Sequence, residues 1–258
     1  MALSLSIVVY LNLHSGLPVV ITAVIALAAC ALSGVVSGFI VVNLRVNSFI
    51  GTLGTSQVLL AVVVLISDNQ QLVAQLPTSW SNIARNNVLG VPIVTIYLVV
   101  IAAVMWFVLE HTRAGRYLFA TGGNEPAARL AGVATDRMLR RSLVASALIA
   151  GLAGVVYSMQ AGVFSASVGP GYLFPAVAAV FLGASQLQQR PNVWGTLIAY
   201  FALAFGVQGL TLSASSASAW SQPLFQGVSL IVAVALASRP RYRKLRNSGE
   251  VTDPEPAA

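Results

Sequence analysis

Long apolar runs separated by short polar segments make up most of this chain of 258 residues. An α-helix needs about 20 apolar residues to cross the ~30 Å hydrocarbon layer of a membrane. The runs cover 17–43, 49–67, 92–109, 142–163, 173–187, 193–212 and 222–238. Residues 1–13 are apolar but too short to span. The pattern predicts an all-α, polytopic membrane helix bundle of about seven spans plus a partial N-terminal element.

The run 173–187 is shorter than the others, and prolines and glycines lie at its start. Gly169-Pro170-Gly171 precedes it and Pro175 lies within its first residues. A re-entrant or broken helix is tolerated in a membrane where protein buries it or where it lines a cavity. This run is therefore compatible with a broken or re-entrant segment as well as with a span.

The composition excludes a soluble globular domain. The chain is 57% hydrophobic and 8% charged, whereas soluble domains carry about 25% charge. The net charge of +7 does not indicate a nucleic-acid partner here, because all Lys and Arg residues except Arg85 fall in alternate loops on one side. The positive-inside rule places that side, and with it the C-terminus, in the cytoplasm.

These charges also predict the domain organisation. Residues 1–238 form a single transmembrane domain that contains a cytoplasmic segment, 111–141. Residues 239–258 form a cytoplasmic tail that is basic at first and then disordered, because its end is polar and rich in Pro. Contacts of the basic residues with membrane lipid headgroups are expected.

The predicted spans hold no Asp, Glu, Lys or Arg. A charge at mid-bilayer costs at least ~2.5–3.5 kcal/mol and is normally kept for ion or proton work. Its absence argues against proton-coupled transport but not against movement of a neutral polar solute. The tools of an intramembrane enzyme are also missing, since there is no carboxylate pair within the spans and no Gly-x-Ser-x-Gly. We therefore expect a protein that is not an enzyme and that binds no metal.

A polar island, Phe119–Val133, interrupts the apolar pattern. Asn124 suits a helix N-cap, and Glu125 and Pro126 suit the first helical turn. Gly132 can end the helix. The predicted product is a helix of about two turns, too short to be stable without a partner groove. Its surface is expected to be small and mildly apolar at Ala127, Ala128, Leu130 and Ala131. The alternative is a connecting loop whose arginines only set the topology.

The residues His111–Val133, "HTRAGRYLFATGGNEPAARLAGV", closely resemble the cytoplasmic coupling segment of ABC-importer permeases. The resemblance is to the monosaccharide (ribose-type) branch, which shares a superfamily with branched-chain amino-acid permeases. The match follows the pattern Thr-x-x-Gly-Arg, then Ala-x-Gly-Gly-Asn-x-x-Ala-Ala-x-Leu-x-Gly. The coupling residues that it implies are Gly122, Gly123, Asn124, Glu125, Ala127, Ala128, Leu130 and Gly132.

The resemblance implies several partners. A separate ATPase subunit would use ATP and receive the short helix in a groove, since this chain has no Gly-x4-Gly-Lys-[Ser/Thr] loop and is expected to bind no cofactor itself. A periplasmic or lipoprotein solute-binding protein would deliver the solute, and a second permease copy, identical or related, would complete the pore. The implied location is the bacterial inner membrane.

The chain departs from the family pattern in four places. After Asn47–Thr55 an Arg-Gly pair is common in the family, and this chain has "SQVLLAVVV" instead. The family's Asp-Leu-Ser-x-Gly element is absent, which favours a chain that begins partway through a larger membrane domain. The residues 171–175 lack the two carboxylates of the family motif. The residues 183–191 replace a glycine-rich run. Because of the last two changes, the sequence does not identify the substrate or the residues of the gate.

A neutral sugar needs hydroxyl and amide partners along its path. The candidates within or near the spans are Asn47, Thr52, Thr55, Gln57, Gln160 and Gln208. Thr52 and Thr55 can face one side of a helix together, whereas Gln57 cannot share that side squarely with Thr55. The competing interpretation is that these side chains bond to other helices or to the carbonyl four residues earlier.

Together these observations predict the permease subunit of an ATP-driven importer that moves a small neutral polar solute, most consistent with a monosaccharide. The alternative is a channel or an ion-coupled secondary carrier for a small solute, which would act without an ATPase and would leave the polar island unexplained.

Overall fold

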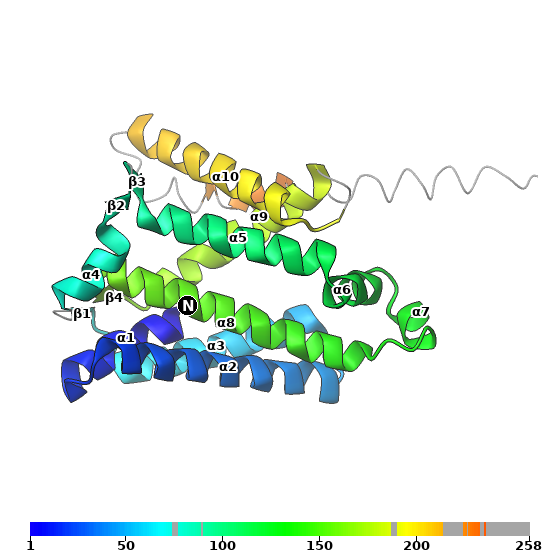
Figure 1. Ribbon diagram of the computed structural model, residues 1–258, viewed down its shortest axis with the longest axis horizontal. Helices are drawn as coiled ribbons and strands as arrows, with labels where there is room; N and C mark the ends of the chain where they lie inside the picture. The colour runs from blue at the N-terminus through cyan, green and yellow to red at the C-terminus, as the bar shows by residue number, and fades with distance from the viewer. Residues whose placement is uncertain are drawn as a thin grey trace, which may run out of the picture. The chain divides into compact units, whose positions relative to one another are not determined.

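A computed structural model describes residues 1–73, 77–88, 90–186, 190–213, 224–225, 227–232 and 235 (Figure 1). Its helices are α1 (Ala2–Ser15), α2 (Val19–Asn43), α3 (Ser48–Ser67), α4 (Thr78–Arg85), α5 (Ile93–His111), α6 (Arg113–Gly123), α7 (Glu125–Leu130), α8 (Thr135–Ala161), α9 (Val168–Gln186) and α10 (Val193–Ser213). Its strands are β1 (Leu72–Val73), β2 (Asn87–Val88), β3 (Val91–Pro92) and β4 (Val163–Phe164). The chain divides into two compact units, Met1–Gly169 and Pro170–Ala258.

Four helices of the described part are long and apolar enough to cross a membrane: α2, α3, α5 and α8. They coincide with the predicted runs 17–43, 49–67, 92–109 and 142–163, and α1, α9 and α10 are shorter apolar helices. The prediction of an all-α membrane helix bundle is confirmed, whereas the number of spans stays a prediction. Residues 222–223, 226, 233–234 and 236–238 of the run 222–238 and all of the tail 239–258 lie outside the described residues.

Two boundaries differ from those that the apolar pattern predicts. Helix α8 begins at Thr135 rather than near residue 142. Its first turns carry Arg137 and Arg140, and arginine favours a helix without being apolar, so the apolar run is shorter than the helix. Helix α9 runs without interruption through Pro175. A proline cannot bond the residue four positions earlier, and that residue is Gly171, so only a bond near the start of α9 is lost. The segment is therefore one helix rather than a broken one.

The first unit is built on the antiparallel pair of α2 and α8 (Figure 1). Their closest approaches join Gly38 to Arg140, Gly34 to Val144 and Gly151 to Cys30, in opposite order along the two helices. Small residues allow this proximity, as is usual between helices in a membrane.

Helix α1 packs against α2, α8 and α3. Leu5, Val8 and Val9 are fully buried there. The short apolar segment at residues 1–13 is therefore a helix of the core, and it ends at Gly16, whose φ is +56°.

The end of the first unit that lies far from α6 and α7 is closed by short elements (Figure 1). Strand β1 pairs antiparallel with β4, and Phe164 of β4 is fully buried. Arg85 of α4 donates from Nε and Nη2 to the carbonyl oxygen of Gln160, at 3.0 and 2.8 Å. These contacts fix the last turn of α8, so that both ends of this helix are held.

Candidate functional site

The polar island contains more helix than the sequence pattern predicts. Helix α6 occupies its first part, and Thr112 is its N-cap. The Thr112 hydroxyl accepts a hydrogen bond from the Gly115 amide at 3.3 Å and donates to the Val108 carbonyl at 2.6 Å. A Cβ at Gly115 would overlap the carbonyl group of Leu109, so the tight turn between α5 and α6 requires glycine there. The Thr-x-x-Gly spacing was the signal that could have located α6.

Helix α7 has the local structure that the sequence predicts. The Ala127 amide donates to the Asn124 side-chain oxygen at 3.1 Å, which makes Asn124 the N-cap. Glu125 and Pro126 form the first turn. Gly132, with φ of +81°, follows the C-cap residue and turns the chain away from the helix. Six residues form this helix, and Figure 1 shows it beyond the ends of α6 and α8.

The outward face of α7 differs from the predicted one at one position. Ala128 is 6% exposed and packs within the chain itself, whereas Leu130 is 91% exposed. The expectation that Ala128 belongs to an outward apolar surface is therefore wrong. The face that remains available is formed by Leu130 with the exposed Ala127 and Ala131. The other two predicted residues of the segment, Gly122 and Gly123, are the exposed last residues of α6.

An arginine joins α7 to the start of α8. The Nη2 atom of Arg129 lies 3.1 Å from Glu125 Oε1 and 2.8 Å from Asp136 Oδ1. Its Nε and Nη2 also donate to the Thr135 hydroxyl, at 3.3 and 3.1 Å. Sequence reasoning missed this cluster, because only the Glu125–Arg129 spacing of four residues is a local signal.

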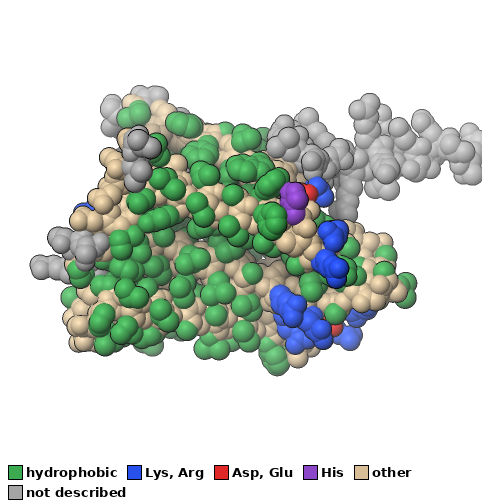
Figure 2. Space-filling view, in the orientation of Figure 1, with side chains coloured by type: hydrophobic (Ala, Val, Ile, Leu, Met, Phe, Trp, Pro, Cys, Tyr) green, Lys and Arg blue, Asp and Glu red, His purple; other side chains and the backbone are tan. Residues whose placement is uncertain are grey.

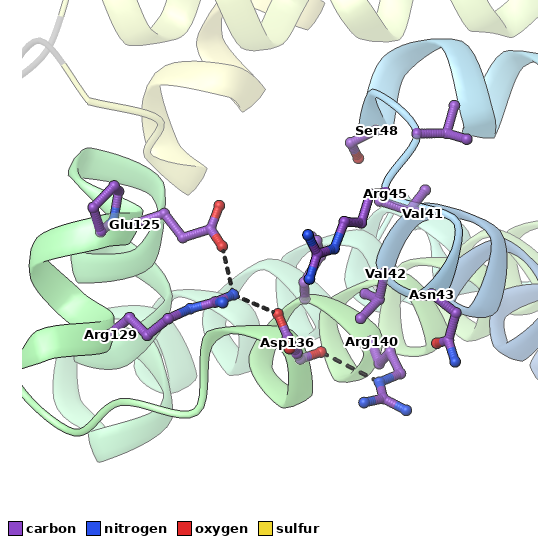
Figure 3. A pocket seen from close by; sticks show the side chains of 12 residues that line it. Val41, Val42, Asn43, Arg45, Ser48, Glu125, Arg129, Asp136 and Arg140 are labelled. Atoms are coloured by element: carbon purple, nitrogen blue, oxygen red, sulfur yellow. Dashed lines mark hydrogen bonds and ion pairs between the residues drawn. The ribbon is translucent and has the colours of Figure 1, made fainter.

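A groove opens between this cluster and the turn that joins α2 to α3 (Figure 3). Its volume is about 810 Å³. Figure 3 shows Glu125 and Asp136 on either side of the Arg129 guanidinium, and Arg45 directed toward them from the other wall. Most of the Lys and Arg side chains visible in Figure 2 gather over this end of the first unit, next to a surface dominated by hydrophobic side chains.

A second cavity, of about 280 Å³, lies among α2, α3 and α8. Two of the predicted path residues, Thr52 and Thr55, line it together. The other hydroxyls at its wall belong to Ser33, Ser37, Ser56 and Ser146. The structure thus brings the predicted pair onto one side of α3 and adds serines from two neighbouring helices, which no spacing within one helix could reveal.

Hydroxyl groups at this cavity donate hydrogen bonds to backbone carbonyls of their own helix. Thr55 donates to the Gly51 carbonyl at 2.8 Å, and Ser37 donates to the Ser33 carbonyl at 2.9 Å. Thr52 donates to the Ser48 carbonyl at 2.8 Å. A hydroxyl oxygen that donates once still has lone pairs to accept a bond. The side chains of this wall therefore present hydroxyl acceptors and carry no charge, which suits a solute that carries hydroxyl donors.

The other predicted path residues lie elsewhere. The Asn47 side chain caps α3, accepting from the Phe49 amide at 2.9 Å. Gln57 is exposed on α3, and Gln160 is exposed at the end of α8. Gln208 lines a separate cavity within the second unit, of about 210 Å³. The structure therefore does not bring Asn47, Gln57 or Gln160 to the hydroxyl-lined cavity, and Gln208 belongs to the other unit.

These features indicate a class of membrane protein. Within the described residues, four helices have the length of a membrane span, and a hydroxyl-lined cavity lies between three of them. A capped helix lies beyond their ends, and together these parts are typical of a polytopic membrane transport protein.

Comparison with known proteins identifies the family. The family model described as "Branched-chain amino acid transport system / permease component" matches residues 1–236. The "Ribose import permease protein RbsC" of Escherichia coli (strain K12) is 32% identical over 220 residues, which cover 83% of this chain and 67% of that protein. The "Fructose import permease protein FrcC" of Rhizobium meliloti is 31% identical over 244 residues, 92% of this chain and 67% of that protein.

A third relative has a different named cargo. The "Autoinducer 2 import system permease protein LsrC" of Enterobacter sp. (strain 638) is 30% identical over 247 residues, 94% of this chain and 70% of that protein. No solved structure matches the chain. The chain belongs to the permease family, and it is a multi-pass transport protein of the bacterial inner membrane.

Proposed function

We propose that this chain is the permease subunit of an ATP-driven importer, and that it moves a small neutral polar solute, a monosaccharide, across the inner membrane. The observation that carries the proposal is α7, a capped helix that presents Leu130 almost fully to its surroundings beyond the ends of the long helices. An exposed Leu on such a short helix gains free energy only when a partner covers it.

The partner of α7 is a separate ATPase subunit, which uses the ATP. Its groove would cover Leu130 and the neighbouring Ala127, and the Asn124 cap and the Gly122-Gly123 pair would set the position of the helix. The orientation follows from the arginines near α7, which the positive-inside rule places in the cytoplasm together with the C-terminus. A solute-binding protein on the outer side, a second permease copy and membrane lipid complete the assembly.

The solute class is supported by the cavity among α2, α3 and α8. Thr52, Thr55 and the surrounding serines offer hydroxyl oxygens and no charge. A neutral polyol can donate to these oxygens, and among the described residues no charged side chain lines the cavity to bind an ion. Relatives named for the import of ribose and fructose also support a monosaccharide.

The decisive experiment replaces Leu130 by Arg in the complex reconstituted with its ATPase and binding protein. Covering the Leu side chain contributes about 1.5–3 kcal/mol, so its loss is expected to weaken ATPase association at least about tenfold. Leu130→Met conserves volume and is expected to retain association and uptake. Both variants should unfold at the temperature of the parent chain, because Leu130 is 91% exposed.

A third variant separates docking from folding. Ala128→Arg places a charge within the packing of α7 on its own chain, so it is expected to lower both thermal stability and association. Unchanged association and uptake in Leu130→Arg would contradict the role of α7. Solute uptake by vesicles that lack the ATPase would instead support a channel or a secondary carrier.

A further inference from the structure

The groove between α7 and the α2–α3 turn holds an imbalance of charge. Three arginines line it, Arg45, Arg129 and Arg140, together with two carboxylates, Glu125 and Asp136. Arg129 bonds both carboxylates, as described above. Within the part of the chain that the structure describes, Arg45 and Arg140 have no ion-pair partner. The groove therefore has a net charge of +1, and the guanidinium groups of Arg45 and Arg140 face it without an ion pair of their own among the described residues.

The backbone and the helix packing determine the positions of Arg45 and Arg140. Arg45 follows the end of α2 with φ of +54°, a left-handed backbone conformation that a side-chain-bearing residue adopts only at a cost. The stem of Arg140 lies against α2 at Gly38, because no side chain there stands in its way. Its Nε donates to the Asp136 carbonyl at 3.4 Å, which leaves the outer nitrogens of the guanidinium unbonded.

The remaining walls are apolar. Val41, Val42, Val46 and Leu139 line the groove beside the arginines. On α2, the preceding residues Phe39, Val36 and Val35 are exposed and lead from the groove along the apolar surface. A cationic recess at the edge of an apolar helix surface matches a molecule with an oxyanion at one end and hydrocarbon at the other.

We propose that this groove binds a phosphate oxyanion between Arg45 and Arg140, supplied by the headgroup of an anionic phospholipid of the inner leaflet. Guanidinium groups offer paired donors that match phosphate oxygens. The acyl chains would lie on the exposed apolar residues of α2. Glu125 and Pro126 of α7 form the opposite wall, so the bound headgroup lies between the α2–α3 turn and α7. The proposal does not depend on the solute that the protein moves.

The test compares two double variants of the full chain. Arg45→Gln with Arg140→Gln removes both groove cations. Arg137→Gln with Arg141→Gln removes the same charge from exposed positions of α8 that do not line the groove. Each protein is placed in nanodiscs of phosphatidylcholine alone or mixed with phosphatidylglycerol. Retained phosphatidylglycerol is counted by native mass spectrometry, and thermal unfolding is followed in parallel.

The groove variant is expected to lose phosphatidylglycerol affinity by roughly tenfold or more, because two charge-assisted hydrogen-bond partners are removed. The control variant is expected to change it by less than about threefold, because Arg137 and Arg141 do not line the groove. Arg45→Lys with Arg140→Lys keeps the charge but not the paired donors, and should fall between the two.

A third arm identifies the source of the phosphate. Inorganic phosphate is titrated into the phosphatidylcholine nanodiscs. Stabilisation by phosphatidylglycerol alone supports a lipid site, and stabilisation by inorganic phosphate that the groove variant abolishes supports a site for a soluble anion. Equal losses in the groove and control variants, or no loss in either, would overturn the proposal, because then the groove arginines have no selective role.

Discussion

Substitution of Gly34 by Ala tests the packing of α2 against α8, on which the first unit is built. A Cβ at Gly34 would lie 2.7 Å from the Val144 Cα and 2.9 Å from the Ala147 Cβ. Favourable contacts between carbon atoms occur at about 3.5–4.0 Å. The two helices must therefore separate by roughly 1 Å at this level, because the nearest atom is backbone and cannot rotate away.

The expected cost follows from two opposing effects. Overpacking of a close interface typically costs about 1–3 kcal/mol, and a gap of about 1 Å weakens the neighbouring contacts by up to half. Ala gains up to about 1 kcal/mol over Gly in helix propensity. We expect Gly34→Ala to lower the free energy of unfolding by about 1–2 kcal/mol.

A matched control lies one turn further along the same helix. A Cβ at Gly38 would lie 3.3 Å from the Arg140 Cγ, in a flexible side chain that can move by a few tenths of an ångström. Gly38→Ala therefore gains helix propensity at little packing cost, and its stability should stay within about 1 kcal/mol of the parent chain. The two substitutions are chemically identical, so their difference reports the neighbour that each one meets.

The assay is reversible unfolding of both variants in lipid nanodiscs, followed by tryptophan fluorescence and by proteolysis. The Gly34→Ala protein should have a lower free energy of unfolding than the Gly38→Ala protein under every condition. Because Gly34 also lines the hydroxyl-lined cavity, the same variant should slow solute uptake. If Gly38→Ala were the less stable of the two, the antiparallel register of α2 and α8 described here would be wrong.

Two further substitutions test local features. Asn124→Ala removes the acceptor of the Ala127 amide and is expected to cost about 1 kcal/mol at α7, seen as faster amide exchange there with an unchanged global unfolding temperature; equal exchange in both proteins would contradict the cap. Thr55→Val removes a hydroxyl from the cavity at constant shape and should slow uptake about tenfold, whereas Thr55→Ser should retain it. Uptake that is unchanged in Thr55→Val would remove this cavity from the solute path.

The sequence predicts those parts of the molecule that depend on neighbours in the chain. The Asn124 cap and the turn at Gly132 follow from residue types at fixed offsets, and the structure has both. The long helices follow from the apolar runs. The burial of Ala128 does not follow, because it depends on contacts of α7 with α6 and α8 that no local pattern encodes.

The candidate site shows the same division. Thr52 and Thr55 share one side of α3, and that pair is predictable from a spacing of three residues. Ser33 and Ser37 of α2 and Ser146 of α8 also line the cavity, and they are recognised only once the helices are packed. Asn47 is a polar residue near a span that the sequence predicts as a path residue, and the structure shows that its side chain caps α3.

One helix connects the two functional regions of the first unit. Asp136, which bonds Arg129 and so holds α7, lies ten residues before Ser146 at the hydroxyl-lined cavity. Ten helical residues span about 15 Å, and a continuous helix of this length moves as a rigid body. A displacement of α7 that is carried through Arg129 would therefore shift one wall of the cavity.

The opposite wall of the cavity belongs to α3, which begins at the turn that carries Arg45. The groove thus lies where the start of α8 and the start of α3 approach each other, and the cavity lies between the same helices further along. If the groove changed its width, rigid-body movement of α3 and α8 would widen or narrow the cavity, without a series of side-chain rearrangements between the two sites. For this reason the ion pairs of Arg129 matter more for their position than for their stability, since exposed pairs contribute only about 0.2–1 kcal/mol each.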